Sequence, residues 1–475
     1  MTRVEKMVLA IAVLASFVAF LDGTVVNVAL PAIVDELGGG IATQQWTVDA
    51  YLITLGSLIL VAGSLSDAFG RIRILRVGLV LFGVASLAIA AAPDPLFLVL
   101  ARGLQGVAGA LLVPSSLALI TSTFDGNARG RAIGIWTGLT SVAMILGPLI
   151  GGVFVDLLSW RLAFVINVVP IAITLVLLAR LGQRDETVAG VRIDYLGAVL
   201  CTLGLGGPVF ALIEQGNLGW AHPAIYLSMG LGVLAFAGFL VRQRFAPNPI
   251  MPLQLFTVRN FWAGNLATAF IYGALGLTGL VVGVFLQERA GLLATFAGLA
   301  ALPSTVLMIL FSSRVGALSA RFGARVFMTV GPIVAGLGAL LYLMVRPAPD
   351  FDYWTQALPA VLVFGAGLTL TVSPLTSAIL GSIEHTRAGT ASAVNNAVAR
   401  VAGLVLTAMV GIIAGGELDL EGFQRATIVT AGLLIAGGVI SFLGIRADPA
   451  EGEGAFAPSP RSQRRGPSRP AGDSE

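Results

Sequence analysis

Apolar stretches of roughly 18 to 25 residues, each enough to cross a bilayer as a helix, recur along nearly the whole chain and constrain its fold. The chain is 56% hydrophobic and only 11% charged, whereas a soluble domain carries about 25% charged residues. We therefore predict an all-α polytopic membrane protein with about 14 transmembrane helices. The expected spans lie near Met7–Leu30, Thr47–Leu65, Ile74–Ala92, Leu96–Ser122, Ala132–Leu157, Leu162–Leu181, Ile193–Ile213, Pro223–Val241, Phe261–Gln287, Ala294–Phe311, Val326–Val345, Ala357–Ile379, Gly389–Ala414 and Thr427–Ile445.

The loops between these stretches alternate in charge. Loops that follow odd-numbered spans carry acids, such as Asp35, Asp350 and Glu417, whereas loops that follow even-numbered spans carry arginines, such as Arg129 and Arg314. Cytoplasmic loops are the ones rich in Arg and Lys. The alternation therefore predicts an even number of spans and two cytoplasmic termini.

The string Gly-x-Leu-Ser-x-x-Phe-Gly occurs twice, at residues 63–70 and 316–323, each time between the second and third spans of its half. This internal repeat predicts two related six-helix bundles, as in many secondary transporters. We expect an N-terminal bundle over residues 1–185, two additional transmembrane helices over 186–252 and a C-terminal bundle over 253–446. Residues 447–475 are rich in Pro, Gly, Ser and Arg, which predicts a disordered cytoplasmic tail.

Five ordered motifs carry a family resemblance: residues 21–31 (LDGTVVNVALP), 63–73, 100–106 (LARGLQG), 147–152 (GPLIGG) and 160–167 (WRLAFVIN). Together they resemble the fourteen-helix drug:proton antiporters of the major facilitator superfamily. That resemblance implies the major facilitator fold, residence in the bacterial cytoplasmic (inner) membrane, and efflux of lipophilic or cationic compounds against entering protons. The family also includes exporters of single natural products, so a dedicated metabolite exporter is the alternative.

Two charged residues within the spans are the candidates for proton coupling. Asp22 lies inside the first span, where a charge costs about 2.5–3.5 kcal/mol on insertion scales. A carboxyl that gains and loses a proton as access alternates meets the needs of coupling; a purely structural acid is the alternative. Arg102 lies inside the fourth span, and the resemblance implies that its charge tunes a nearby carboxyl. A structural ion pair or a snorkelling side chain is the other interpretation.

Two motifs are candidates for conformational control. Gly63, Asp67, Gly70, Arg71 and Arg73 are expected to form a gate, with the carboxylate as a breakable ion-pair partner or a helix cap; arginines that only obey the topology rule are the alternative.

The second motif comprises Gly147, Pro148, Gly151 and Gly152, which should bend the fifth span and allow close packing. The resemblance associates this motif with export, whereas an ordinary kinked helix needs no such role. Polar residues within spans are candidates for lining a substrate cavity: Asn27, Gln105, Asn265, Asn395 and Arg400.

Other classes of function lack the residues they need. Lys6 is the only lysine, so the chain has no Walker A sequence, and an ATPase subunit is not implied. Cys201 lies in an apolar run and the two histidines lie near span ends, which predicts no metal site, no cofactor and no enzymatic centre. A channel is disfavoured by the two-bundle repeat, and nucleic-acid binding by the spread of the arginines. The expected partners are a small-molecule substrate, protons and the lipid bilayer.

Overall fold

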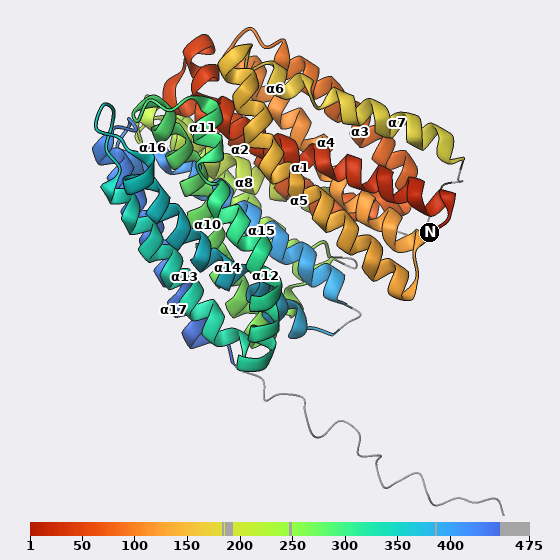
Figure 1. The fold of residues 1–475 in the computed structure, drawn as a ribbon. Helices are drawn as coiled ribbons and strands as arrows, with labels where there is room; N and C mark the ends of the chain where they lie inside the picture. Colours follow the sequence, from red (N-terminus) through yellow and green to blue (C-terminus); the bar gives the residue numbers. More distant parts are fainter. Residues whose placement is uncertain (183–184, 186–192, 247–248, 385–386, 447–475) are drawn as a thin grey trace, which may run out of the picture.

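The computed structural model describes residues 1–182, 185, 193–246, 249–384 and 387–446 (Figure 1). These residues form helices, turns and loops, and none of them lies in a β-strand. The predicted disordered tail, 447–475, lies outside the described residues, as does most of the stretch around the predicted boundary at residue 185.

The first half of the chain forms one group of packed helices. In chain order these are α1 (Arg3–Leu37), α2 (Gly40–Phe69), α3 (Arg71–Ala90), α4 (Pro95–Thr123), α5 (Gly126–Leu157), α6 (Leu162–Val165) and α7 (Val168–Leu181). Within this group α1 packs on α4, α5 and α7, and α4 packs on α2 and α3. Polar caps fix where two of these helices begin: Thr2 and Glu5 form a capping box on α1, and Asp94 caps α4.

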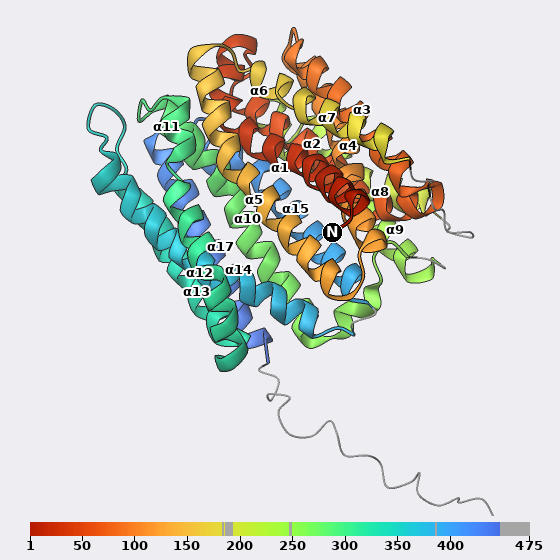
Figure 2. The same cartoon turned by 45° about the vertical axis from the view of Figure 1, so that its right-hand side comes forward.

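The second half forms a similar group. It comprises η1 (Leu253–Thr257), α10 (Arg259–Glu288), α11 (Ala294–Leu299), α12 (Leu302–Phe322), α13 (Ala324–Leu341), η2 (Tyr342–Met344), η3 (Tyr353–Ala357), α14 (Leu358–Gly381), α15 (Ala388–Ala408), α16 (Val410–Ala414) and α17 (Leu420–Gly444). Here α14 packs on α12 and α13, and α10 packs on α15 and α17. The two groups lie beside each other in both views (Figures 1 and 2).

Between the two groups in the sequence, α8 (Tyr195–Leu218) and α9 (Pro223–Phe245) form a helical pair. Asp194 caps α8 and also accepts a hydrogen bond from Arg242 Nε of α9 at 2.6 Å, which ties the two helices together. α8 packs on α2 of the first half and on α15 of the second. The pair therefore lies along the seam between the two halves.

Among the described residues, thirteen helices or helix pairs are long and apolar enough to cross a membrane, and α2 makes a fourteenth when its segments Gly40–Ile59 and Val61–Phe69 are taken together. This confirms the predicted all-α membrane fold and its span count. The outer helix faces carry many exposed apolar side chains, for example Leu157 at 74% and Leu234 at 69%, as lipid contact requires. The side of the membrane that the termini face stays a prediction.

The sequence repeat falls at equivalent turns of the two halves. Gly70 joins α2 to α3 at φ 97° and ψ 136°, and Gly323 joins α12 to α13 at φ 87° and ψ 137°. Positive φ is cheap only for glycine, so the final glycine of each copy allows the same sharp turn between two spans. The turn geometry supports the interpretation of the string as a structural repeat.

Among the described residues, the two halves share hydrophobic clusters where α1 ends and along α2, α8 and α15. Near the end of α1, Leu30 and Ile33 lie in one cluster with Phe285 of α10 and Phe423 of α17. Near the beginning of α1, the buried cluster draws only on residues 7–181, and a separate one draws on residues 251–445. The halves are therefore joined where α1 ends and have separate cores where α1 begins.

Candidate functional site

The carboxylate of Asp22 lies at the centre of a buried polar network in the first half. Its Oδ2 accepts a hydrogen bond from Arg102 Nη1 at 2.7 Å, and the two side chains are 0% and 1% exposed. Its Oδ1 accepts from Gln105 Nε2 at 2.9 Å and from Asn167 Nδ2 at 3.1 Å. The two candidates for proton coupling thus form a direct ion pair whose acidic member has three donors.

Arg102 has further partners that fix its guanidinium. Its Nε donates to the backbone carbonyl of Thr47 at 2.8 Å, its Nη1 also donates to Gln105, and its guanidinium carbon lies 4.5 Å from the centre of the Tyr51 ring. Ser86 accepts from Gln105 and Asn167 on the other side of Asp22. A buried ion pair needs such additional hydrogen bonds to offset the desolvation of both charges.

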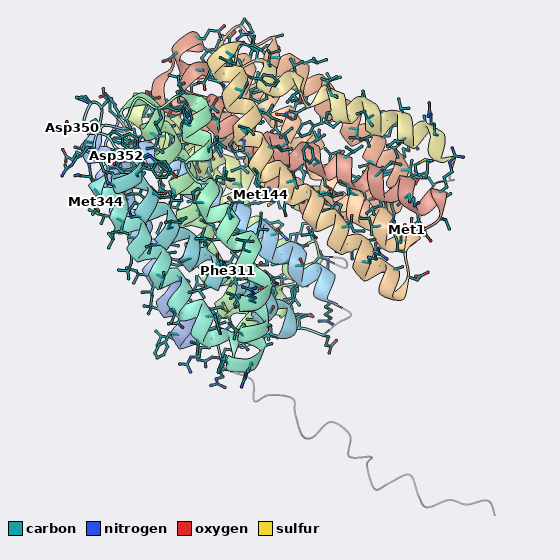
Figure 3. All side chains as sticks on the ribbon, viewed as in Figure 1. Met1, Met144, Phe311, Met344, Asp350 and Asp352 are labelled. Carbon is teal, nitrogen blue, oxygen red and sulfur yellow. The ribbon has the colours of Figure 1, made fainter. Side chains whose placement is uncertain are left out.

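The ion pair lies next to a cavity between the two halves. This cavity, of about 300 Å³, is lined from the first half by α1, α2, α4 and α5 and from the second by α10 and α15. Arg102 and Tyr51 line it, whereas Asp22 lies behind Arg102. A neighbouring cavity of about 340 Å³ shares Thr24, Asn27, Met144, Leu275 and Gly279 with it. Figure 3 shows Met144 on α5 between the two halves. We call the two together the central cavity.

The predicted cavity-lining residues fall into three groups. Asn27 and Arg400 line the central cavity. Gln105 belongs to the Asp22 network instead. Asn265 and Asn395 bond to each other at 3.2 Å, which joins α10 to α15, and neither lines the central cavity.

The glycine motif of α5 lies at the seam between the halves. A Cβ on Gly152 would lie 2.3 Å from the Cα of Thr295 at the start of α11, and a Cβ on Gly298 would lie 2.8 Å from the Cβ of Pro148. A Cβ on Gly147 would lie 2.0 Å from Thr24 Oγ1 of α1, and Gly151 faces Val25 of the same helix. The motif therefore lets α5 approach both α1 and the opposite half.

Asp156, one turn beyond Gly152, stabilises the same contact between α5 and α11. It was not among the candidates from the sequence. Its carboxylate accepts from the backbone N–H groups of Ala294 and Thr295 at 2.8 and 2.9 Å, and from the Thr295 hydroxyl at 2.6 Å. A carboxylate of the first half thus caps a helix of the second, an arrangement favoured by the partial positive charge of a helix N-terminus.

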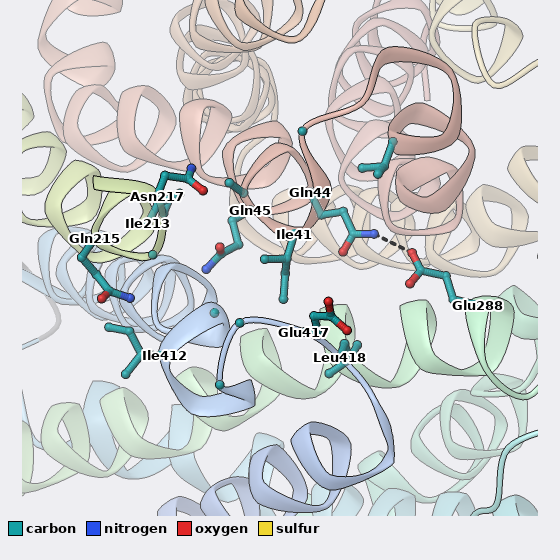
Figure 4. A pocket seen from close by; sticks show the side chains of 18 of the residues that line it. Ile41, Gln44, Gln45, Ile213, Gln215, Asn217, Glu288, Ile412, Glu417 and Leu418 are labelled. Carbon is teal, nitrogen blue, oxygen red and sulfur yellow. Dashed lines mark hydrogen bonds between the residues drawn. The ribbon is translucent and has the colours of Figure 1, made fainter. Parts of the chain in front are cut away.

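Two glutamines of α2 also cross the seam at this end. Gln45 Nε2 donates to the carbonyls of Thr407 and Ala408 at 2.9 and 2.8 Å. Gln44 Nε2 donates to Glu288 Oε1 at 2.8 Å. Both glutamines and Glu288 line a pocket of about 670 Å³ at this end of the bundle (Figure 4).

The predicted gate between α2 and α3 forms a local ion pair. Arg71 Nη2 lies 3.4 Å from Asp67 Oδ1, and both side chains are partly exposed. Asp67 does not cap α3: Asp185 does, accepting from the backbone N–H groups of Ile72 and Arg73 at 3.0 and 2.7 Å. Gly70 is required there because a Cβ would lie 2.3 Å from the Asp185 carboxyl carbon. Gly63 lies in α2, where a Cβ would meet nothing within 4 Å.

A second buried acid was also missed. Asp49 of α2 is 0% exposed, and neither of its carboxylate oxygens has a hydrogen-bond partner among the described residues. Hydropathy placed the start of this helix at Thr47, so Asp49 fell at the span end. The structure places the start at Gly40, so Asp49 lies well inside the helix. The described residues contain no group of three or more His, Cys, Asp or Glu side chains that could hold a metal ion.

Two solved transporter structures share this arrangement of helices. A peptide transporter POT in complex with sulfate superposes with a TM-score of 0.69 at 14% identity, covering 92% of this chain and 94% of that one. A bacterial homologue of the human lysosomal transporter Spinster, in an inward-facing and unoccupied conformation, gives 0.68 at 15% identity, covering 94% and 97%. At these identities the likeness concerns the fold.

Sequence relatives are closer. The chain is 35% identical to the methylenomycin A resistance protein of Bacillus subtilis, covering 86% of this chain and 87% of the relative. It is 31% identical to the puromycin resistance protein pur8 of Streptomyces alboniger, covering 96% and 95%. It is 33% identical to the cephamycin export protein CmcT of Amycolatopsis lactamdurans, covering 83% and 82%. Residues 12–407 match the family described as the Major Facilitator Superfamily, and the chain therefore belongs to that superfamily.

Proposed function

We propose that this protein exports small lipophilic compounds from the bacterial cytoplasm in exchange for entering protons. The observation that carries the proposal is the buried ion pair of Asp22 and Arg102 beside the central cavity. Relatives named as antibiotic resistance and export proteins support the export of small molecules. The site requires no cofactor, no ATPase subunit and no catalytic group for this task.

The ion pair offers a proton-dependent switch. Protonation of Asp22 removes the negative charge that balances Arg102, while Gln105 and the Thr47 carbonyl still hold the guanidinium in place. The uncompensated charge next to the cavity then changes the energy of this conformation, because removing one partner from a buried pair costs about 3–5 kcal/mol. Proton binding and release at Asp22 would in this way bias the transporter between its two conformations.

The seam contacts provide the corresponding gate. The first six spans and the last six act as two bundles that rock against each other, with α8 and α9 as an additional pair along the seam. The hydrogen bonds from α11 to Asp156, and the close approach of Gly152 to Thr295, hold the bundles together where α1 ends. If the arginine-rich loops face the cytoplasm, this end faces outward, and the central cavity is accessible from the cytoplasm in this conformation.

Asp49 is the second proton-binding group of the proposal. It lies on α2, which contributes Tyr51 to the cavity wall and Gln45 to the seam. An ionised carboxylate without partners is costly in a buried site, so its charge state is coupled to any movement that gives it water or a donor. Entering protons would then have two binding sites in the first half, Asp22 and Asp49.

A dedicated exporter of one natural product is the second candidate, supported by the similarity to the cephamycin export protein. Expression in a drug-sensitive bacterium separates the two. A multidrug exporter raises the inhibitory concentration of several unrelated lipophilic compounds, and a dedicated exporter that of one chemical series; puromycin and a cephamycin belong in the panel. A protonophore should abolish either effect, and resistance that persists with the protonophore would contradict proton coupling.

A further inference from the structure

The central cavity contains an arginine whose Nε atom has no hydrogen-bond partner among the described residues. Arg400 of α15 lines the cavity together with Arg102 and Tyr51. Its Nε atom is buried without a hydrogen bond, and no described carboxylate forms an ion pair with it. A guanidinium held inside a membrane helix bundle needs a counter-charge or water, and no carboxylate among the described cavity-lining residues supplies a counter-charge.

The rest of the cavity wall does not balance this charge. None of the described residues that line the central cavity is an Asp or a Glu. Asp22 lies behind the wall and is already bonded to Arg102, Gln105 and Asn167. A cationic substrate would therefore enter a cavity that is already positive, whereas an anionic substrate would supply the missing partner.

The shape and polarity around Arg400 define what fits beside it. Leu52, Leu275 and Leu280 give apolar wall, and the polar groups of Asn27 and Thr24 lie on the opposite helix α1. The backbones of α10 and α15 approach closely, since a Cβ on Gly276 would lie 2.7 Å from the Cα of Gly403. The volume, about 300 Å³ in this part alone, matches the range of small-molecule pockets.

We propose that the central cavity selects small organic anions, with the apolar body against the leucine wall and a carboxylate, or an equivalent acidic group, on the Arg400 guanidinium. Arg pairs with carboxylates through two parallel N–H donors, and the Nε donor of Arg400 has no partner among the described residues. This inference rests on the proposed export function and narrows its substrate class. It also departs from the cationic compounds that the family resemblance includes among the expected substrates.

A negative charge on the substrate lets the membrane potential contribute to the proposed proton-coupled export. Export of a monoanion in exchange for one entering proton moves two elementary charges in the direction that an inside-negative potential favours. Export of a monocation against one proton moves no net charge and gains nothing from the potential. An anionic substrate therefore allows the membrane potential to contribute in full.

Fragment binding tests the proposal without a known substrate. The purified full-length protein in nanodiscs is heated with increasing benzoate, benzamide or benzylammonium, which share one apolar ring and differ in charge. We expect benzoate to raise the melting temperature at concentrations at least fivefold lower than benzamide, and benzylammonium to have the weakest effect. Equal potency of the three compounds, or a preference for benzylammonium, would overturn the proposal.

Variants locate the effect at Arg400. Arg400→Gln should remove the preference for benzoate, Arg400→Lys should keep part of it, and Arg400→Glu should reverse the order toward benzylammonium. Arg425→Gln, which changes an exposed arginine paired with Glu421, is the matched control and should change nothing. A benzoate preference that survives in Arg400→Gln would refute the assignment. Because binding is measured without a gradient, this result is separate from any failure of proton coupling.

Discussion

Among the described residues, Asp156 on α5 and Thr295 at the start of α11 make the shortest hydrogen bond between the two halves, from the hydroxyl at 2.6 Å, beside a backbone N–H bond at 2.9 Å. The contact joins a negative side chain to the positive end of a helix, and it is made only while the halves are together at this end. Its strength should therefore set the balance between the two conformations.

Weakening this contact should open the end of the bundle where α1 ends. Asp156→Asn keeps the size of the side chain but removes the charge, and hydrogen bonds to charged groups contribute about 1.5–3 kcal/mol. We expect the population with this end open to rise about tenfold or more. Spin labels introduced by Ser159→Cys and Leu293→Cys, in a Cys201→Ser background, would report it as a longer distance. An unchanged distance distribution would rule out Asp156 as a gate, and Asp125→Asn at an exposed loop serves as the control.

Adding a side chain at Gly152 should also separate the two halves at this end, here by steric clash and not by the loss of an attractive contact. Gly152→Ala places a Cβ 2.3 Å from the Thr295 Cα, so α5 and α11 must separate. Gly138→Ala, also on α5, meets nothing within 4 Å. Resistance conferred in cells should fall at least tenfold for the first variant and stay unchanged for the second, at equal amounts of protein in the membrane. Equal activity of the two would mean that the close approach has no role in transport.

Much of this fold could be predicted, because lipid leaves few solutions. An apolar stretch must satisfy its backbone hydrogen bonds internally, so composition and length alone gave the helices and their number. The beginning of α2 was misplaced for a physical reason. Thr43, Gln44 and Gln45 are polar, yet they are buried in the bundle, and hydropathy cannot distinguish a polar residue that bonds across the seam from one in water.

For the candidate site, the sequence could identify individual residues but not the contacts between them. Asp22 and Arg102 stand out because each is a charge inside a span, but their contact depends on how α1 packs on α4, which no local pattern records. Asp156 resembles an ordinary charge at a span end, because its partners are backbone groups of a helix 138 residues away. Asn265 and Asn395 resemble cavity residues by the same measure, and only the packing of α10 on α15 shows that they bond to each other.

Asp49 should act without contributing to the stability of the fold. Since its carboxylate has no partner among the described residues, Asp49→Asn removes no hydrogen bond, and the melting temperature should not fall. The substrate-dependent proton flux should nevertheless decrease severalfold, because one of the two proposed proton-binding sites is lost. A variant with normal flux would remove Asp49 from the account, and a strongly destabilised one would show that it has an important structural role.

Asp22 and Arg102 should show strong energetic coupling in a double-mutant cycle. Removing one member leaves the other charge buried alone, so Asp22→Leu and Arg102→Met should each reduce the free energy of unfolding by about 3–5 kcal/mol. The double variant should recover most of this loss and still fail to transport. Chemical unfolding in detergent measures the four corners of the cycle, and additive effects of the two substitutions would contradict a direct pair.

The most direct test of proton coupling uses the purified protein in liposomes with an imposed pH gradient and a pH-sensitive dye inside. A compound to which the protein confers resistance in cells is added, and wild type is compared with Asp22→Asn and with the exposed control Asp125→Asn. We predict proton flux evoked by the compound in wild type and in the control, and a loss of at least tenfold in Asp22→Asn. The same flux in Asp22→Asn as in wild type would contradict it.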